Sequence, residues 1–166
     1  MSKRLKHREK QFPFRENWRL TAYYAGTNKV AKIITGQNLI VTAGKNMVGD
    51  MLIDAAAQWD TGLTYCALGS DNTAPAVGQT QLVNEGGGGA MRKTITSKTR
   101  VINEIALSTF FTAAQSTLAI KEAAIFGSST AGAAVNSGVM FSRWLVSFDN
   151  SGALYDITID YVLTIG

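Results

Sequence analysis

The sequence predicts a mainly β protein: an antiparallel β-sandwich with one amphipathic helix and an extended N-terminal arm. Three observations support this class. From Trp18 onward, apolar residues recur mostly with a period of two, as expected for half-buried strands. A single segment, about residues 43–59, has helical spacing instead. The first nineteen residues are strongly basic, whereas the remaining chain is nearly neutral.

Size and composition favour a globular chain. A chain of 166 residues has the length of one domain, which buries roughly 70% of the surface that its unfolded form exposes. Apolar residues make up 46% and charged residues 17%, and no apolar run approaches the roughly 18 residues that span a bilayer. We therefore divide the chain into a basic arm, residues 1–19, and a β-sandwich domain, residues 20–166, with no membrane segment.

In the first half, strands are expected near residues 20–24, 30–34 and 39–41, followed by the helix. Met47, Met51, Ala55 and Trp59 fall four residues apart, which places them on one helical face. Thr42 is a plausible N-cap. The helix has glycines in its interior, so packing against a sheet has to stabilise it.

The second half is predicted to be almost entirely strands, separated by clusters of Gly, Ser, Asn and Thr. Apolar and polar residues alternate most regularly in the last strand, as in a half-buried antiparallel strand. Seven or eight strands with one helix predict a β-sandwich, and a jelly roll is also compatible. The expected strands are residues 63–68, 90–97, 100–111, 118–126, 139–148 and 153–165.

The residue types argue against an enzyme. His7 and Cys66 are the only histidine and cysteine, which argues against a Cys-His dyad, a Ser-His-Asp triad or a His/Cys zinc site within one chain. The glycine run 86–89 lacks the spacing and the following helix of a phosphate-binding loop. Asp156 and Asp160 share a strand face but lie about 13 Å apart, too far for an acid–base pair. We expect no cofactor and no metal.

Glu122 leaves two alternatives open. It lies in the apolar strand Ile120–Phe126, where it either points inward or pairs across to a neighbouring strand. The residue pattern does not choose between these alternatives.

The N-terminal arm is the candidate docking segment. Its first nineteen residues contain seven cations and two acids, a net charge of +5, while the rest of the chain has a net charge of −1. Cations with interspersed aromatic rings favour docking into an acidic groove on a protein, and nucleic acid is the less favoured partner because the body lacks a basic surface. The candidate docking residues are Lys3, Arg4, Lys6, Arg8, Lys10, Phe12, Phe14, Arg15, Trp18 and Arg19.

No apolar segment follows these cations, so the arm is not a secretory signal, and we expect synthesis in a cytoplasm.

Several short motifs resemble, in order and spacing, a domain found in structural proteins of tailed bacteriophages. The resemblance implies a virion component, often a trimer, bound to a major capsid or tail protein. Gly86–Gly89 replaces an aromatic and arginine-containing segment of that pattern. The matching motifs are Asn38–Asn46 before the helix, Gly62–Ser70, Thr73–Ala76, Thr80–Glu85, Ile120–Phe126 and the alternating final strand Leu154–Ile165.

From this resemblance we expect an accessory protein on the particle surface, with head decoration preferred because the sequence shows no coiled-coil shaft or distal receptor module. A tail fibre, baseplate or adaptor protein is the alternative. Host recognition would use loops 72–80 or 128–136 to bind a surface glycan. Nucleic-acid binding by the arm is a third class of possible function.

Overall fold

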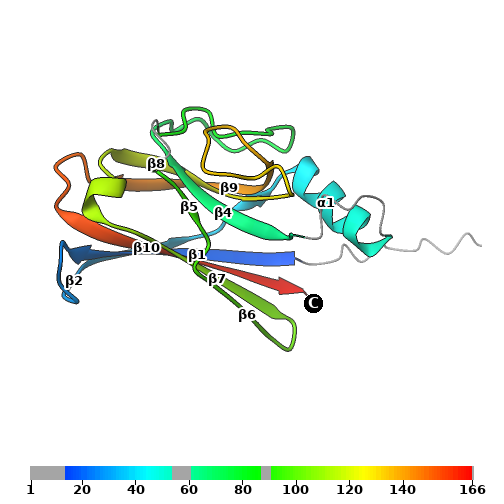
Figure 1. The fold of residues 1–166 in the computed structure, drawn as a ribbon, viewed down its shortest axis with the longest axis horizontal. Coiled ribbons are helices and arrows are strands. Elements are labelled where there is room, and N and C mark those ends of the chain that lie inside the picture. Colours follow the sequence, from blue (N-terminus) through cyan, green and yellow to red (C-terminus); the bar gives the residue numbers. More distant parts are fainter. Residues whose placement is uncertain (1–13, 54–60, 87–90, 166) are drawn as a thin grey trace, which may run out of the picture.

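The computed structural model describes residues 14–53, 61–86 and 91–165. Two five-stranded antiparallel sheets pack as a sandwich, with one α-helix at one end (Figure 1). This confirms the predicted mainly β class. No helix among the described residues is long and apolar enough to cross a membrane.

The first sheet has the order β2-β1-β10-β7-β6. Its central feature is the pairing of the first and last strands along eleven residues, with Phe14 opposite Ile165 and Tyr24 opposite Tyr155. The N-terminal strand is thus held inside the sheet, between β2 and β10. The bounds are β1 Phe14–Tyr24, β2 Val30–Gly36, β6 Ser97–Val101, β7 Glu104–Phe111 and β10 Tyr155–Ile165.

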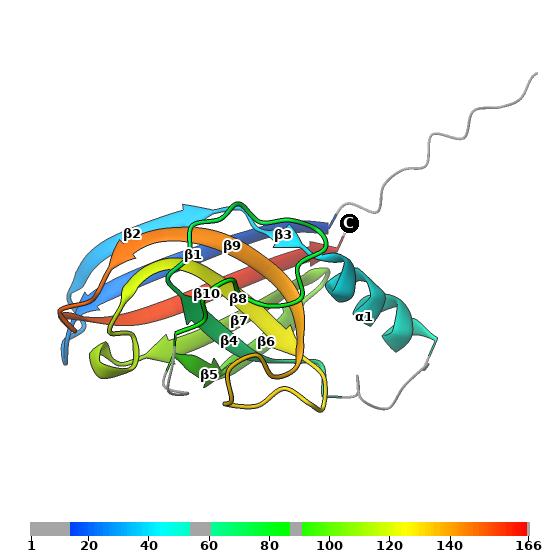
Figure 2. The same ribbon diagram turned by 90° about the horizontal axis from the view of Figure 1, so that it is seen from above.

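The second sheet has the order β3-β9-β8-β4-β5. Its strands are β3 Leu39–Ile40, β4 Leu63–Gly69, β5 Arg92–Thr94, β8 Ala119–Gly127 and β9 Val139–Asp149. A short 3₁₀ helix, η2 Ala113–Gln115, connects β7 to β8. The α-helix α1, Thr42–Leu52, lies at the end of the sandwich where β1 begins and β10 ends, which we call the arm end (Figure 2).

Close backbone approach positions α1. A Cβ on Gly44 would collide with the carbonyl group of Phe141 in β9, so only glycine allows this approach. Val41, at the N-cap, has no side-chain capping bond; instead the Val41 and Thr42 amides donate to the carbonyls of Phe141 and Val77. Packing and backbone bonds therefore hold this helix, as its low intrinsic propensity requires.

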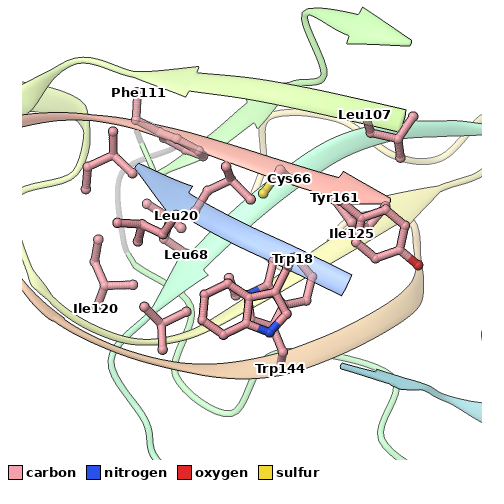
Figure 3. Close-up of a cluster of buried hydrophobic side chains, with 14 of the residues drawn as sticks. Trp18, Leu20, Cys66, Leu68, Leu107, Phe111, Ile120, Ile125, Trp144 and Tyr161 are labelled. Atoms are coloured by element: carbon pink, nitrogen blue, oxygen red, sulfur yellow. The ribbon is translucent and has the colours of Figure 1, made fainter. Parts of the chain in front are cut away.

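Large aromatic rings fill the space between the sheets. Trp18 of β1 stacks on Trp144 of β9 with ring centroids 6.0 Å apart, and Tyr161 of β10 also packs against Trp144, with ring centroids 5.9 Å apart (Figure 3). Cys66 is fully buried among them, and burial raises the pKa of its thiol to about 12. The cysteine therefore acts as a small buried hydrophobic residue of the core.

Element boundaries differ from the predictions in three places. β1 begins at Phe14, six residues before the expected domain boundary, because alternate side chains from Glu16 onward face the core. The helix begins at Thr42 itself, and its predicted continuation, 54–59, lies outside the described residues. The expected strand 100–111 is a hairpin of β6 and β7, turned at Ile102 with a positive φ of 55°.

Candidate docking interface

The structure places four of the predicted docking residues in β1. Phe14 is half-buried and packs against the main core, while Trp18 is only 5% exposed and donates its indole N–H to the Gln37 carbonyl. The Trp18 ring thus belongs to the chain's own core, and docking through this residue stays a prediction. The remaining predicted residues, Lys3, Arg4, Lys6, Arg8, Lys10 and Phe12, lie outside the described residues.

Arg15 and Arg19 point to the outer face of the first sheet. Arg19 lies opposite Asp160 in the β1–β10 register, and the pair forms an ion pair of 2.9 Å. Asp160 also accepts a hydrogen bond from the Ser108 hydroxyl of β7, so this pair links three strands. Arg15 is exposed at the arm end, opposite Thr164. Of these two cations, Arg15 is the better placed to meet a partner.

Exposed aliphatic side chains gather at the same end. Met51 and Ile53 lie at the end of α1, and Val101 and Ile102 at the tip of the β6–β7 hairpin. The start of β1 and the C-terminal end of β10 lie between α1 and this hairpin (Figure 1). Sequence reasoning placed Val101 and Ile102 inside one long strand, because no Gly or Asn-Gly pair marks their turn.

The edge strand β6 adds positive charge near this end. All five of its residues are exposed, including Lys98 and Arg100. These two cations pair in register with the inward-facing Leu107 and Ile105 of β7, so they lie on the core side of an uncovered edge. Charged residues in such a position prevent another strand from pairing with the edge. The edge is therefore suited to side-chain contacts and not to strand addition.

Glu16 is a buried carboxyl group close to the start of β1. It is 7% exposed, and burial raises its pKa to about 7, opposed by the nearby Tyr161 and Asn38 side chains and by the positive charge of Lys45. Neither carboxylate oxygen makes a hydrogen bond of ordinary geometry with the described residues. In the sequence, Glu16 is only one of the two acids of the basic arm. We therefore expect the stability of the fold to depend on pH near neutrality.

A buried ion pair fixes the loop that follows β4. Glu122 of β8 and Arg143 of β9 are both fully buried, with Nε and Oε2 2.8 Å apart. Glu122 accepts hydrogen bonds from the amides of Val83 and Asn84, and Arg143 donates to the Thr73 carbonyl. Both open alternatives for Glu122 are therefore realised: the carboxylate is buried and also paired with the next strand.

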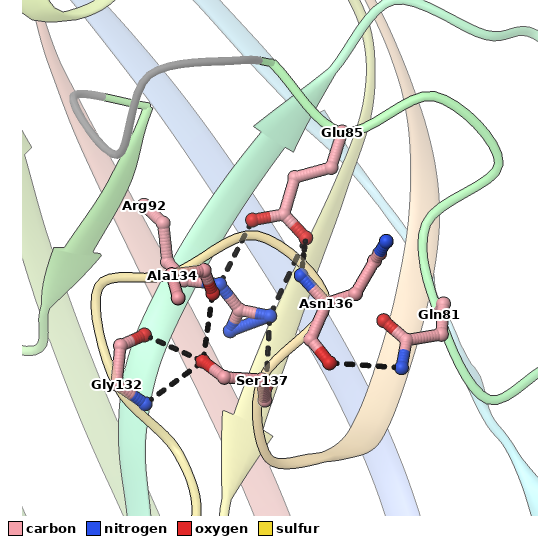
Figure 4. A network of polar contacts seen from close by, with 7 residues as sticks. All are labelled: Gln81, Glu85, Arg92, Gly132, Ala134, Asn136 and Ser137. Atoms are coloured by element: carbon pink, nitrogen blue, oxygen red, sulfur yellow. Dashed lines mark hydrogen bonds and ion pairs between the residues drawn. The ribbon is translucent and has the colours of Figure 1, made fainter.

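A second buried ion pair fixes the loop between β8 and β9. Arg92 of β5 contacts Glu85 at 2.8 Å and donates to the Ser137 carbonyl, while Glu85 also accepts from the Asn136 amide (Figure 4). The Arg92 guanidinium lies 3.8 Å from the centre of the Phe126 ring. These loops contain the segments considered for glycan binding, and several of their polar groups are committed to contacts within the chain.

Two open hollows lie on the outer face of the first sheet. One of about 590 Å³ is lined by residues including Asn17, Arg19 and Val162, and one of about 500 Å³ by residues including Tyr23 and Phe110. Among the residues that the structure describes, no group of three or more His, Cys, Asp or Glu side chains is placed to hold a metal ion. The two hollows give this face an uneven surface that includes charged side chains such as Arg19 and Asp160.

Comparison with known proteins finds no matching protein family, no matching curated protein and no matching solved structure. The residues and the fold of this chain alone therefore have to support any proposal about its function.

Proposed function

We propose that the chain is a structural protein of a tailed-bacteriophage virion, an accessory component that docks on the particle surface through its basic arm. The observation that carries the proposal is the separation of charge: residues 1–19 have a net charge of +5 and the remaining chain −1. Head decoration is preferred, with an acidic groove of the major capsid protein as the partner. A tail fibre, baseplate or adaptor role is the alternative.

The way the arm joins the body supports an anchoring role. Residues 1–13 lead directly into β1, which is an interior strand paired with β10 over eleven residues and with β2 on its other side. Hydrogen bonds of an antiparallel ladder run perpendicular to the strands, so a pull along β1 loads all of them together. An arm attached to this strand transmits force to the centre of the sandwich, where Trp18 is locked against Trp144.

The cations of the arm should control attachment. Replacing Lys3, Arg4, Lys6, Arg8 and Lys10 together by Gln in the full chain should slow attachment to particles produced without this protein by more than about tenfold at low salt, because complementary charge speeds encounter. Binding is measured by sedimentation of labelled chain with the particles. Electron microscopy of particles that carry the labelled wild-type chain then shows whether the chain binds to the head or to the tail.

The matched control exchanges Lys for Arg and Arg for Lys at the same five positions, which keeps the charge, and should attach like the wild type. Equal attachment of the Gln variant and the wild type would contradict docking through the arm.

We also propose that the protein acts as a trimer, which would multiply weak arm contacts through avidity. The outer face of the first sheet, with its two hollows, is not covered by any described residue and is available for contact with copies of the chain. Sedimentation equilibrium at micromolar concentration should report three copies of the 17.8 kDa chain. A single 17.8 kDa species across that concentration range would contradict the trimer.

A further inference from the structure

The tip of the β6–β7 hairpin has an unusual surface. Ile102 is 84% exposed, the highest value for a large hydrophobic side chain among the described residues, and the adjacent Val101 is 67% exposed. Turn tips normally carry polar residues or glycine, because these tolerate water and the required backbone angles. The exposure of two neighbouring β-branched aliphatic side chains at such a tip therefore requires a physical explanation.

The backbone at Ile102 is also strained. Its φ of 55° lies in the left-handed region, which β-branched residues rarely adopt because the branched side chain is crowded by the backbone there. The neighbouring contacts impose this conformation. The Asn103 side chain donates to the Ile165 carbonyl, the Ile165 amide donates to the Asn103 carbonyl, and Arg100 donates to the Ile102 carbonyl at 2.8 Å. The tip is thus held in a defined position with its aliphatic side chains in water.

The position of the tip connects it to the arm. Its contacts fasten it to Ile165, the residue that lies opposite Phe14 where the arm enters β1. Positive charge lies near the tip on both faces of the sheet: Arg15 is on the outer face at the start of β1, and Lys98 and Arg100 are on the core side of β6, while Glu104 is the acid on the outer face. A surface that attracts the arm would therefore also attract this part of the body.

We propose that the β6–β7 hairpin inserts Ile102, flanked by Val101, into an apolar pocket of the same acidic protein surface that binds the arm. The inference rests on the proposed function and adds a second contact to it. The positive charge of the arm and of β6 indicates that the partner surface is acidic. The aliphatic tip indicates that the partner is a protein with an apolar pocket. Single-stranded nucleic acids are bound through cations and stacked aromatic rings, and the tip carries no aromatic ring.

Ile102→Gly is the direct test, because glycine adopts the positive φ freely while the aliphatic group is removed. The variant chain should attach to particles produced without this protein at least about tenfold more weakly than the wild type, as for a central interface residue. Its thermal unfolding temperature should equal or exceed that of the wild type. Ile102→Asn, which tolerates the same backbone region, should show the same loss of attachment.

Leu154→Ser is the matched control. Leu154 is 61% exposed in the turn between β9 and β10, beside Ala153, which also has a positive φ of 51°. This variant should attach like the wild type, since the residue lies at the opposite end of β10 from Ile165.

The outcomes separate the two proposals. If the wild-type chain does not attach to the particles, the proposed function fails. If the wild type attaches and Ile102→Gly attaches equally well, the inference about the hairpin is overturned while the proposed function stands. Binding of the wild-type chain to a short DNA duplex, reduced in the same proportion by Ile102→Gly, would assign the tip to nucleic acid and also overturn the inference.

Discussion

Replacing Glu122 by Ala should lower the free energy of unfolding by about 3–5 kcal/mol, because it leaves the Arg143 guanidinium buried without its counter-charge. Both side chains of this ion pair are fully buried. The substitution also removes the acceptor for the amides of Val83 and Asn84. Urea unfolding followed by circular dichroism measures the loss, and amide hydrogen exchange at these two residues should accelerate.

The Arg19–Asp160 pair is the matched control for this prediction. It also links adjacent strands, but the arginine side chain is 56% exposed. Exposed pairs contribute about 0–1 kcal/mol, so Arg19→Ala should have a small effect. A loss below about 1 kcal/mol for Glu122→Ala would show that the loop after β4 does not depend on the buried pair.

Replacing Glu16 by Gln should stabilise the fold at high pH by about 3 kcal/mol and have a much smaller effect near pH 5. Burial raises the pKa of Glu16 from 4.5 to about 7 in the folded chain. The folded chain therefore binds the proton more tightly than the unfolded chain. The stability from this proton is fully present below pH 4.5 and is lost as the pH rises through about 7. Gln imitates the neutral form at every pH.

Thermal or urea unfolding between pH 5 and pH 8 tests this prediction. The difference between Glu16→Gln and the wild type should grow across that range. Glu104→Gln is the control, because Glu104 is exposed on the outer face of the same sheet and surface substitutions usually change stability by less than about 0.5 kcal/mol. Parallel stability curves for Glu16→Gln and the wild type would rule out an ionised, buried Glu16 as a source of pH sensitivity.

The arm boundary shows where sequence patterns mislead. Arg15, Glu16 and Arg19 give the segment before Leu20 the composition of a charged arm, although it is the first half of a central strand. Alternation was visible in Trp18, Leu20 and Ala22, but Glu16 on the same face broke the pattern. Burial raises the pKa of this carboxyl group to about 7, which composition does not reveal.

The buried ion pairs were also beyond sequence reasoning. Glu122 and Arg143 are 21 positions apart, and each also contacts loop residues that come from elsewhere in the chain. Thr73, Asn84, Glu85 and Glu122 all take part in fastening loops to the second sheet, through partners that lie far away in the sequence.

The residue pattern alone determined the mainly β class, the start of the single helix near Thr42 and the inward face of β10, because the periods of strands and helices are properties of neighbouring residues. Only the tertiary structure decided that β1 pairs with β10, that Trp18 stacks on Trp144, and that Ile102 protrudes where the arm enters the body. Those contacts join residues more than 60 positions apart. Which of these distant residues meet depends on which apolar surfaces are buried against each other when the two sheets pack.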